Sequence, residues 1–222
     1  MKYLLSIIIS LFTFSANAEL NCLLPENIFG EACEKEREEL EKNKKQGYLE
    51  EEYLEDEWTV SVVQHEGKDT SDWGINASVN GRVTHGDRFR VRILPRDLNL
   101  CNNGNLITTF YTHIINKKTL EFSDLVIPAL FNNQKINVQI LFAQKFLMGY
   151  SVTIDLGWNE LKNIKDFFKN EKEVSLQLLD SEKIKVEDYF DIVENTFSLT
   201  GLNDALDRAK NECIRIVNER NG

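Results

Sequence analysis

The chain has 222 residues, of which 42% are apolar, 28% charged and 10% aromatic, a composition typical of globular proteins. Its 36 acidic and 26 basic residues give a formal net charge of −10, so the average surface repels a phosphate backbone and nucleic acid is not an expected partner. This composition excludes collagen-like, low-complexity and polytopic membrane proteins.

The first eighteen residues have the pattern of a secretory signal peptide. A positive charge at Lys2 precedes the apolar run 4–12, and small residues follow at Ala16 and Ala18. This order is typical of an exported protein, and the apolar run is shorter than the ~20 residues that span a bilayer. We therefore expect cleavage of residues 1–18 and a periplasmic or secreted protein without a membrane span; a retained N-terminal anchor is the alternative.

Export changes the expected role of the four cysteines. An oxidising compartment favours disulfides, and four cysteines allow three pairings. We expect Cys22–Cys33, which closes a short loop, and Cys101–Cys213. No two of them stand two to four residues apart in sequence, so their spacing predicts neither a zinc site nor a CxxC redox site.

Residues 19–57 are expected to form this stapled loop and an acidic helical segment. The stretch 31–57 has twelve acidic and five basic residues and is rich in helix formers, with Gly47 as a break. Pairs such as Glu38–Lys42 favour a helix. The few apolar residues make no stripe, so the prediction is a solvated segment laid over the domain, with an interaction arm for a basic partner as the alternative.

From Trp58 onward, alternation of apolar and polar residues predicts antiparallel strands. The Asn80-Gly81 dipeptide predicts a two-residue hairpin. Strands are expected at 58–62, 75–79, 89–93, 106–114, 136–142, 150–154, 174–179 and 189–199. So many short strands favour a mainly β domain over residues 58–217, an antiparallel β-sandwich or a partly open barrel.

Two helices are expected within this domain. Trp158–Asn170 has apolar residues three and four apart and predicts a short cover helix. The second begins after Thr200 as N-cap and closes the domain at the C-terminus, while residues 218–222 should fray. Its apolar face places Cys213 on the buried side and consists of Leu202, Leu206, Ala209, Cys213 and Ile216.

Three segments, Tyr150–Leu156, Val174–Leu178 and Phe197–Leu202, followed by Cys213, resemble the C-terminal part of the invasion-associated locus B family. In that family a Phe-x-Leu-x-Gly-Phe segment opens a closing helix that often ends in cysteine. The resemblance covers about residues 136–213, and Leu202 replaces the family's aromatic residue. It implies an exported bacterial accessory protein with a β-sandwich-like core, linked to host-cell interaction, and transfers no catalytic residues.

The spacing of the candidate catalytic residues predicts no enzyme. His65, His85 and His113 form no H-x-x-x-H or H-x-H pair, so a zinc site with Asp87 is not expected. There is no G-x-S-x-G elbow and no G-x-x-x-x-G-K-[ST] phosphate loop. The many carboxylates leave a glycosidase-type pair open without selecting two of them. We expect no metal and no cofactor.

Arg88, Arg90 and Arg92 alternate with apolar residues, which places them on one face of a predicted strand. One interpretation is a solvated outer face whose arginines pair with acidic residues across strands. The other is a bidentate clamp for an anion or carboxylate. These three arginines are the candidate binding residues, for a protein partner in the cell envelope or for another copy of the chain.

Together these features favour an exported, non-enzymatic binding or assembly protein of the bacterial periplasm or cell envelope. An exported hydrolase with an unrecognised carboxylate site and an inhibitor of an exported enzyme are the alternatives.

Overall fold

The computed structural model describes residues 47–53, 57–65, 74–83, 86–146 and 148–221. The predicted signal peptide, the predicted pair Cys22–Cys33 and the acidic stretch up to residue 46 lie outside the described residues, as does His85.

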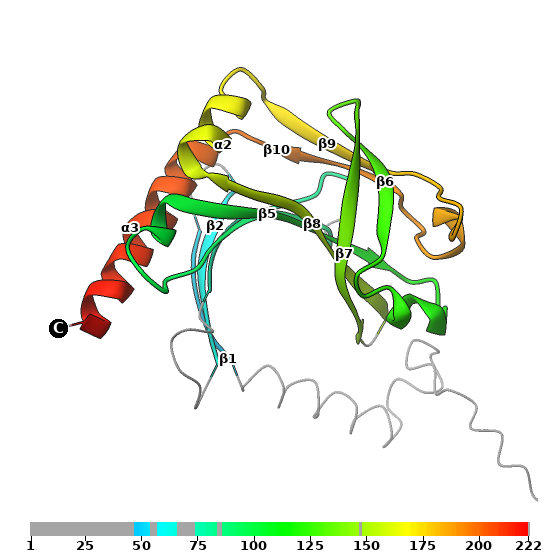
Figure 1. Ribbon diagram of the computed structural model, residues 1–222, viewed down its shortest axis with the longest axis horizontal. Helices are drawn as coiled ribbons and strands as arrows, with labels where there is room; N and C mark the ends of the chain where they lie inside the picture. The colour runs from blue at the N-terminus through cyan, green and yellow to red at the C-terminus, as the bar shows by residue number, and fades with distance from the viewer. Residues whose placement is uncertain (1–46, 54–56, 66–73, 84–85, 147, 222) are drawn as a thin grey trace, which may run out of the picture.

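The fold is mainly β, as predicted, and its strands form one antiparallel sheet (Figure 1). The order in the 10-stranded sheet is β1-β2-β3-β4-β5-β8-β7-β6-β9-β10. The strands are β1 (Gly47–Tyr53), β2 (Thr59–His65), β3 (Gly74–Asn80), β4 (Arg88–Ile93), β5 (Asn103–Thr112), β6 (Val126–Phe131), β7 (Gln134–Phe146), β8 (Gly149–Glu160), β9 (Glu173–Leu178) and β10 (Glu194–Ser198).

The last strand of the sheet returns to the third. Gly81, directly after β3, forms an antiparallel bridge with Phe197 of β10. Arg82 N donates to Thr196 O at 2.9 Å beside it. We call this contact the β3–β10 junction. It connects two segments that are more than a hundred residues apart in sequence and that stand at separate places in the strand order.

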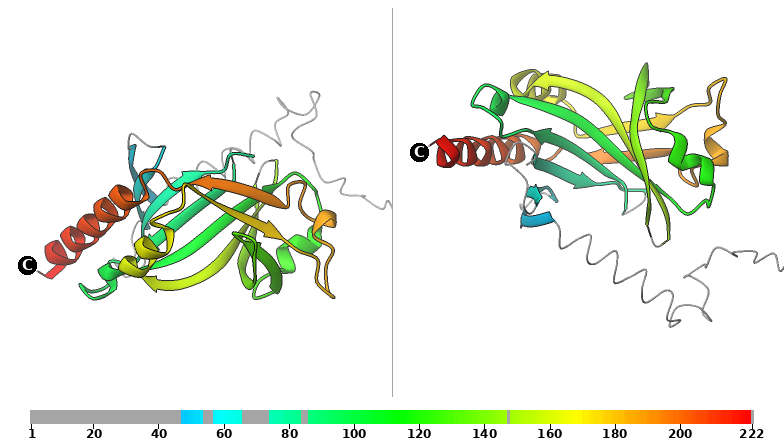
Figure 2. Two further views of the ribbon diagram at one scale, coloured as in Figure 1. Left: turned by 90° about the horizontal axis from the view of Figure 1, so that it is seen from above. Right: turned by 60° about the horizontal axis from the view of Figure 1, so that its bottom comes forward.

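Two α-helices complete the fold in the part of the chain that the structure describes. The short α2 (Leu161–Phe168) follows β8, and the long α3 (Leu202–Asn221) packs against β2, β3 and β4 and touches α2. Figure 2 shows α3 projecting from one end of the sheet. All five residues of its predicted apolar face are buried. The predicted disulfide Cys101–Cys213 is confirmed, with 5.6 Å between the Cα atoms, and joins α3 to the 3₁₀-helix η2 (Leu100–Asn102).

The buried apolar side chains form two clusters. The first core lies under α3 and α2 and is centred on Trp58, Phe89 and Phe197. The second core lies between β5–β9 and the 3₁₀-helices η3 (Lys117–Glu121) and η4 (Val186–Asp188), and contains Phe110 and Phe190. Two half-buried side chains, Phe131 and Leu156, pack against both cores.

Gly47–Tyr53 is a strand, so the prediction of a helical acidic segment is wrong for these residues. β1 pairs with β2 along its whole length, from Gly47 opposite His65 to Tyr53 opposite Thr59. Pairing with a sheet edge gives the backbone tertiary hydrogen bonds. These outweigh the helix propensity of a glutamate-rich stretch, because propensity is a weak determinant of structure beside tertiary contacts. The sheet therefore includes residues before the predicted domain boundary at 58.

The predicted two-residue hairpin at Asn80-Gly81 is also wrong. Asn80 pairs with Arg88, so residues 81–87, and not a two-residue turn, separate the paired ends of the two strands. Gly81 instead meets β10, and a Cβ at this position would collide with the Asn195 side chain. The glycine is needed for this close approach of β10, which a local turn signal does not show.

Helix boundaries differ from the prediction at three points. Trp158 still belongs to β8, because α2 begins at Leu161. Gly201, with φ of +85°, directly precedes α3, so Thr200 is not its N-cap. The helix continues to Asn221 instead of fraying from 218, and Arg220 Nη2 donates to Arg96 O at 2.6 Å.

The strand β6 was not predicted from the sequence, because Pro128 interrupts its apolar pattern.

Candidate functional site

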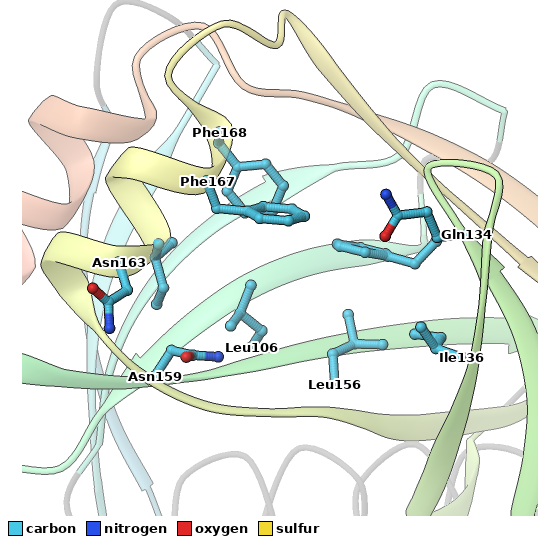
Figure 3. Close-up of a pocket in the computed structure, with 10 residues that line it drawn as sticks. Leu106, Gln134, Ile136, Leu156, Asn159, Asn163, Phe167 and Phe168 are labelled. Carbon is cyan, nitrogen blue, oxygen red and sulfur yellow. The ribbon is translucent and has the colours of Figure 1, made fainter.

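The candidate site is a cavity of about 360 Å³ between α2 and the sheet (Figure 3). In Figure 3, Phe167 and Phe168 of α2 lie on one side of it, and the aliphatic Leu106, Leu156 and Ile136 lie on the opposite side. The lining residues are Leu106, Phe131, Gln134, Ile136, Leu156, Asn159, Asn163, Ile164, Phe167 and Phe168. An aromatic wall therefore faces an aliphatic one.

The aromatic wall follows from two consecutive phenylalanines on α2. Neighbouring residues of an α-helix point about 100° apart, so both cannot enter the core. Phe168 is buried and meets Phe89 of the first core edge-to-face at 6.2 Å between ring centroids. Phe167 is 56% exposed, and its ring is nearly parallel to that of Phe131, at 13° and 6.4 Å between centroids.

The aliphatic wall depends on an irregularity in β8. Leu106 and Ile107 of β5 pair with Gly157 and Asp155, so Leu156 is an extra residue in the ladder. Gly157 has φ of +109°, and its N–H donates to Asp155 Oδ1 at 2.8 Å. A bulge of this kind redirects a side chain. Here it allows Leu156 to line the cavity while packing against both cores.

The polar groups of the cavity are uncharged amides. Asn159 and Asn163 lie at one end in Figure 3, and Gln134 lies at the other. Such amides donate and accept hydrogen bonds without titrating. None of the described lining side chains is ionisable, so these residues offer groups that orient a ligand and no group that transfers a proton.

A second, more polar cavity of about 370 Å³ adjoins the first and shares Gln134 and Phe167 with it. Its outer side is the turn at Asn132, where Asn132 Oδ1 accepts from Ser175 N at 2.9 Å and Asn132 N donates to Ser175 O at 3.0 Å. Its one carboxylate is Glu171. The two cavities together therefore combine an apolar part with a more polar one.

The predicted binding residues Arg88, Arg90 and Arg92 share one face of β4, as expected, but they do not line either cavity. Arg88 is exposed, whereas Arg90 and Arg92 are half-buried. The interpretation of these arginines as a solvated outer face therefore fits Arg88 alone of the three. Burial lowers the pKa of both half-buried guanidinium groups. Arg90 Nη2 donates to Thr109 Oγ1 at 2.8 Å.

Asp87 lies at the β3–β10 junction and forms hydrogen bonds within the protein. Its carboxylate is fully buried and accepts from Tyr111 N and from Asn195 Nδ2, both at 2.8 Å. Burial raises its pKa to about 6, although both hydrogen bonds lower it. Asn195 Oδ1 in turn accepts from Val83 N at 3.0 Å. Asp87 therefore connects the residues between β3 and β4 to β5 and β10.

His113 contacts Asp191 rather than Asp87, with 2.9 Å between Nδ1 and Oδ2. Within the described ranges, no three His, Cys, Asp or Glu side chains lie together in a way that could hold a metal ion.

Sequence reasoning missed the cavity itself. The predicted cover helix Trp158–Asn170 contains both Phe167 and Phe168, but the apolar spacing does not show which ring is buried and which is exposed. The usable signal was the pair of adjacent phenylalanines on a helix of eight residues, because such a pair leaves one ring outside the core. The bulge at Leu156 has no comparable signal, since it depends on the pairing of β8 with β5.

The chain matches no protein-family model, no curated protein and no solved structure. The resemblance of residues 136–213 to the invasion-associated locus B family therefore stays a prediction. No helix within the part of the chain that the structure describes is long and apolar enough to cross a membrane.

Proposed function

We propose that this protein is an exported, non-enzymatic binding protein that holds a small, flat, uncharged molecule in the cavity beside α2. The observation that carries the proposal is the lining, in which an aromatic and an aliphatic wall face each other and amides stand at the ends. Small-molecule sites have this volume and this mixture of apolar walls with few polar groups. A charged ligand would lose its hydration here without gaining a counter-charge.

The lining also supports binding over hydrolysis. General acid–base catalysis needs a titratable group within hydrogen-bonding reach of the substrate. The first cavity has none among its lining residues, and the second has only Glu171, which is not a carboxylate pair. No feature of the two cavities favours the hydrolase or the inhibitor.

Export to the periplasm or the outside of the cell is part of the proposal. The disulfide Cys101–Cys213 supports it, because such bonds persist in oxidising compartments. A protein partner in the cell envelope, self-association and a link to host-cell interaction remain predictions.

We infer further that the sheet is a partly open barrel rather than a sandwich. The β3–β10 junction supports this, because strands β3 to β10 then return on themselves while β1 and β2 continue beyond the junction. A barrel of this kind encloses the two cores within one curved sheet and opens beside α2, where the cavity lies.

The test is a fluorescence titration of the protein lacking residues 1–18 with N-phenyl-1-naphthylamine, an uncharged aromatic probe. The parent should bind it with enhanced emission, and Phe167→Ala should weaken binding about tenfold, the effect of losing one aromatic contact of ~1.4 kcal/mol. Because Phe167 is exposed, its replacement should leave the melting temperature within ~2 °C.

Phe142→Ala is the matched control, since Phe142 of β7 is similarly exposed and lines neither cavity. It should bind the probe as the parent does. Equal affinity of all three proteins, or no binding by the parent, would overturn the assignment of the cavity. Release of nitrophenol from nitrophenyl glycosides in excess of the protein would favour the hydrolase instead.

A further inference from the structure

The face of the sheet opposite Leu106 carries polar residues in rows across three strands. Arg92 of β4 pairs with Asn76 of β3 on one side and with Asn105 of β5 on the other. The next row contains Ser78, Arg90 and, on β5, the buried apolar Ile107. Side chains of alternate residues share a face of a sheet, so these groups lie together, on the other side from the cavity.

Four buried polar atoms of this face have no hydrogen-bond partner within the described residues. They are Nε of Arg90, Nε of Arg92, Oδ1 of Asn76 and Oδ1 of Asn105. Native proteins pair nearly all buried polar atoms, so each exception indicates a missing partner. Two of the four are donors on cations, which hydrogen-bond most strongly to anionic oxygens.

The charges of the two guanidinium groups also lack a carboxylate partner among the described residues. Other arginines of the described chain form salt bridges, for example Arg82 with Glu173 and Arg215 with Glu212. Among the same residues, no carboxylate forms one with Arg90 or Arg92. Instead, the electrostatic neighbours of Arg90 are the cations Arg88 and Arg92 together with Tyr111, and that of Arg92 is the cation Arg96.

The surrounding backbone and side chains fix these guanidinium groups in place. Arg92 lies against the backbone of Gly74, where a Cβ would stand 2.7 Å from its Nε. Any larger residue at 74 would displace it. Thr109 Oγ1 accepts from Arg90 Nη2 at 2.8 Å, which orients the fork of that side chain. Both arginines remain half-buried, so solvent still reaches part of each of them.

We propose that Arg90 and Arg92 form a binding site for the oxyanion group of a small molecule, a carboxylate or a phosphate. Guanidinium N–H groups donate in pairs to the oxygens of either group. Residues two apart on a strand stand about 6.6 Å apart, so one oxyanion can bridge two long arginine side chains. This site is independent of the uncharged cavity, which lies on the other face.

The experiment is thermal unfolding of the protein lacking residues 1–18, with inorganic phosphate or acetate at ionic strength held constant by chloride. At a phosphate concentration 100-fold above the dissociation constant, the parent should melt ~5–10 °C higher. Arg92→Gln should abolish the shift. Arg88→Gln is the control and should keep it, because Arg88 is exposed. A shift with acetate alone would assign the site to carboxylates.

Arg92→Lys keeps the positive charge and serves as a second variant if Arg92→Gln does not fold. Because lysine lacks the planar fork, phosphate should bind at least tenfold more weakly, measured by isothermal titration calorimetry. Equal phosphate shifts in the parent and both Arg92 variants would show a general salt effect and overturn the site, as would no shift in the parent. N-phenyl-1-naphthylamine should bind all variants alike, so this result and that for the cavity are separable.

Discussion

The two cores are covered in different ways. The first core is covered by the continuous helix α3, which the disulfide Cys101–Cys213 ties down. The second core is covered by loops and by the short 3₁₀-helices η3 and η4, and no helix of comparable length within the described residues covers it. The cavity lies where the cores meet, beside Phe131 and Leu156. One end of a single sheet can thus be covered by a helix while a cavity of ligand size remains between its two cores.

The largest expected effect on stability comes from removing the disulfide Cys101–Cys213, which holds α3 over the first core. Replacing Cys101 and Cys213 by serine removes a cross-link between residues 112 apart, which in the chain-entropy model costs about 4–5 kcal/mol. The melting temperature measured by calorimetry should fall by ~10–20 °C. Cys33→Ser, in the predicted shorter loop, should cost only about 3 kcal/mol. A larger fall for Cys33→Ser would contradict the ranking.

A matched pair of substitutions compares the two cores directly. Phe168→Ala and Phe190→Ala each remove a buried ring, and such truncations cost about 3–5 kcal/mol. Phe168→Ala should lie at the upper end, because the rings of Phe89 and Phe131 contact it and α3 holds its surroundings rigid. Phe190→Ala should lie at the lower end, since loops can collapse into the space. Urea unfolding measures both, and the reverse order would show that the second core is the more rigid.

The pH dependence of stability tests the β3–β10 junction, whose two strands both contribute side chains to the first core. The pKa of Asp87 rises from 3.8 to about 6 on folding, so the folded state binds the extra proton and this group destabilises the protein as pH rises between those values. The contribution is about 3 kcal/mol at most. The parent should therefore gain stability relative to Asp87→Asn when pH falls from 7 to 4.

Urea unfolding of both proteins at the two pH values gives this difference, in which the titration of other groups cancels. Asp87→Asn should also cost stability at pH 7, because its amide NH₂ would face the Asn195 Nδ2 donor. A difference between parent and variant that does not change with pH would show that Asp87 keeps its ordinary pKa.

The smallest expected effect concerns the link between α2 and α3. Lys165 Nζ and Asp207 Oδ1 are 2.6 Å apart, and Asp207 is mostly exposed. Ion pairs at the surface contribute about 0–1 kcal/mol and are screened by salt. A double-mutant cycle with Lys165→Met and Asp207→Asn should give a coupling in this range. A coupling above ~2 kcal/mol would mean that the two helices are held together by charge rather than by the first core.

The sequence was sufficient where the structure depends on local periodicity. The alternation after Trp58 predicts β2, β3 and β4, and the apolar stripe of α3 predicts the burial of Cys213 and so its disulfide. It was insufficient where pairing partners decide the conformation. Gly47–Tyr53 is a strand because β2 lies beside it, and Gly81 leaves its expected turn because it bridges Phe197 and lies against the Asn195 side chain.

The candidate site shows the same division. Alternation correctly places Arg88, Arg90 and Arg92 on one face, but their burial depends on neighbouring strands that the sequence does not identify. The cavity needs the bulge at Leu156 and the approach of β6 to α2, both of which are tertiary.

The β3–β10 junction also limits when the native contacts can form during synthesis of the chain. During synthesis Gly81 emerges long before Phe197, and Cys101 long before Cys213. Neither the bridge nor the disulfide can therefore form until most of the chain has been made. Contacts between residues so far apart in sequence close late and slow folding. Until the C-terminal residues arrive, the strands that α3 will cover expose their apolar side to the surroundings. Loss of the last twenty residues should therefore produce an aggregating chain, not a slightly smaller folded one.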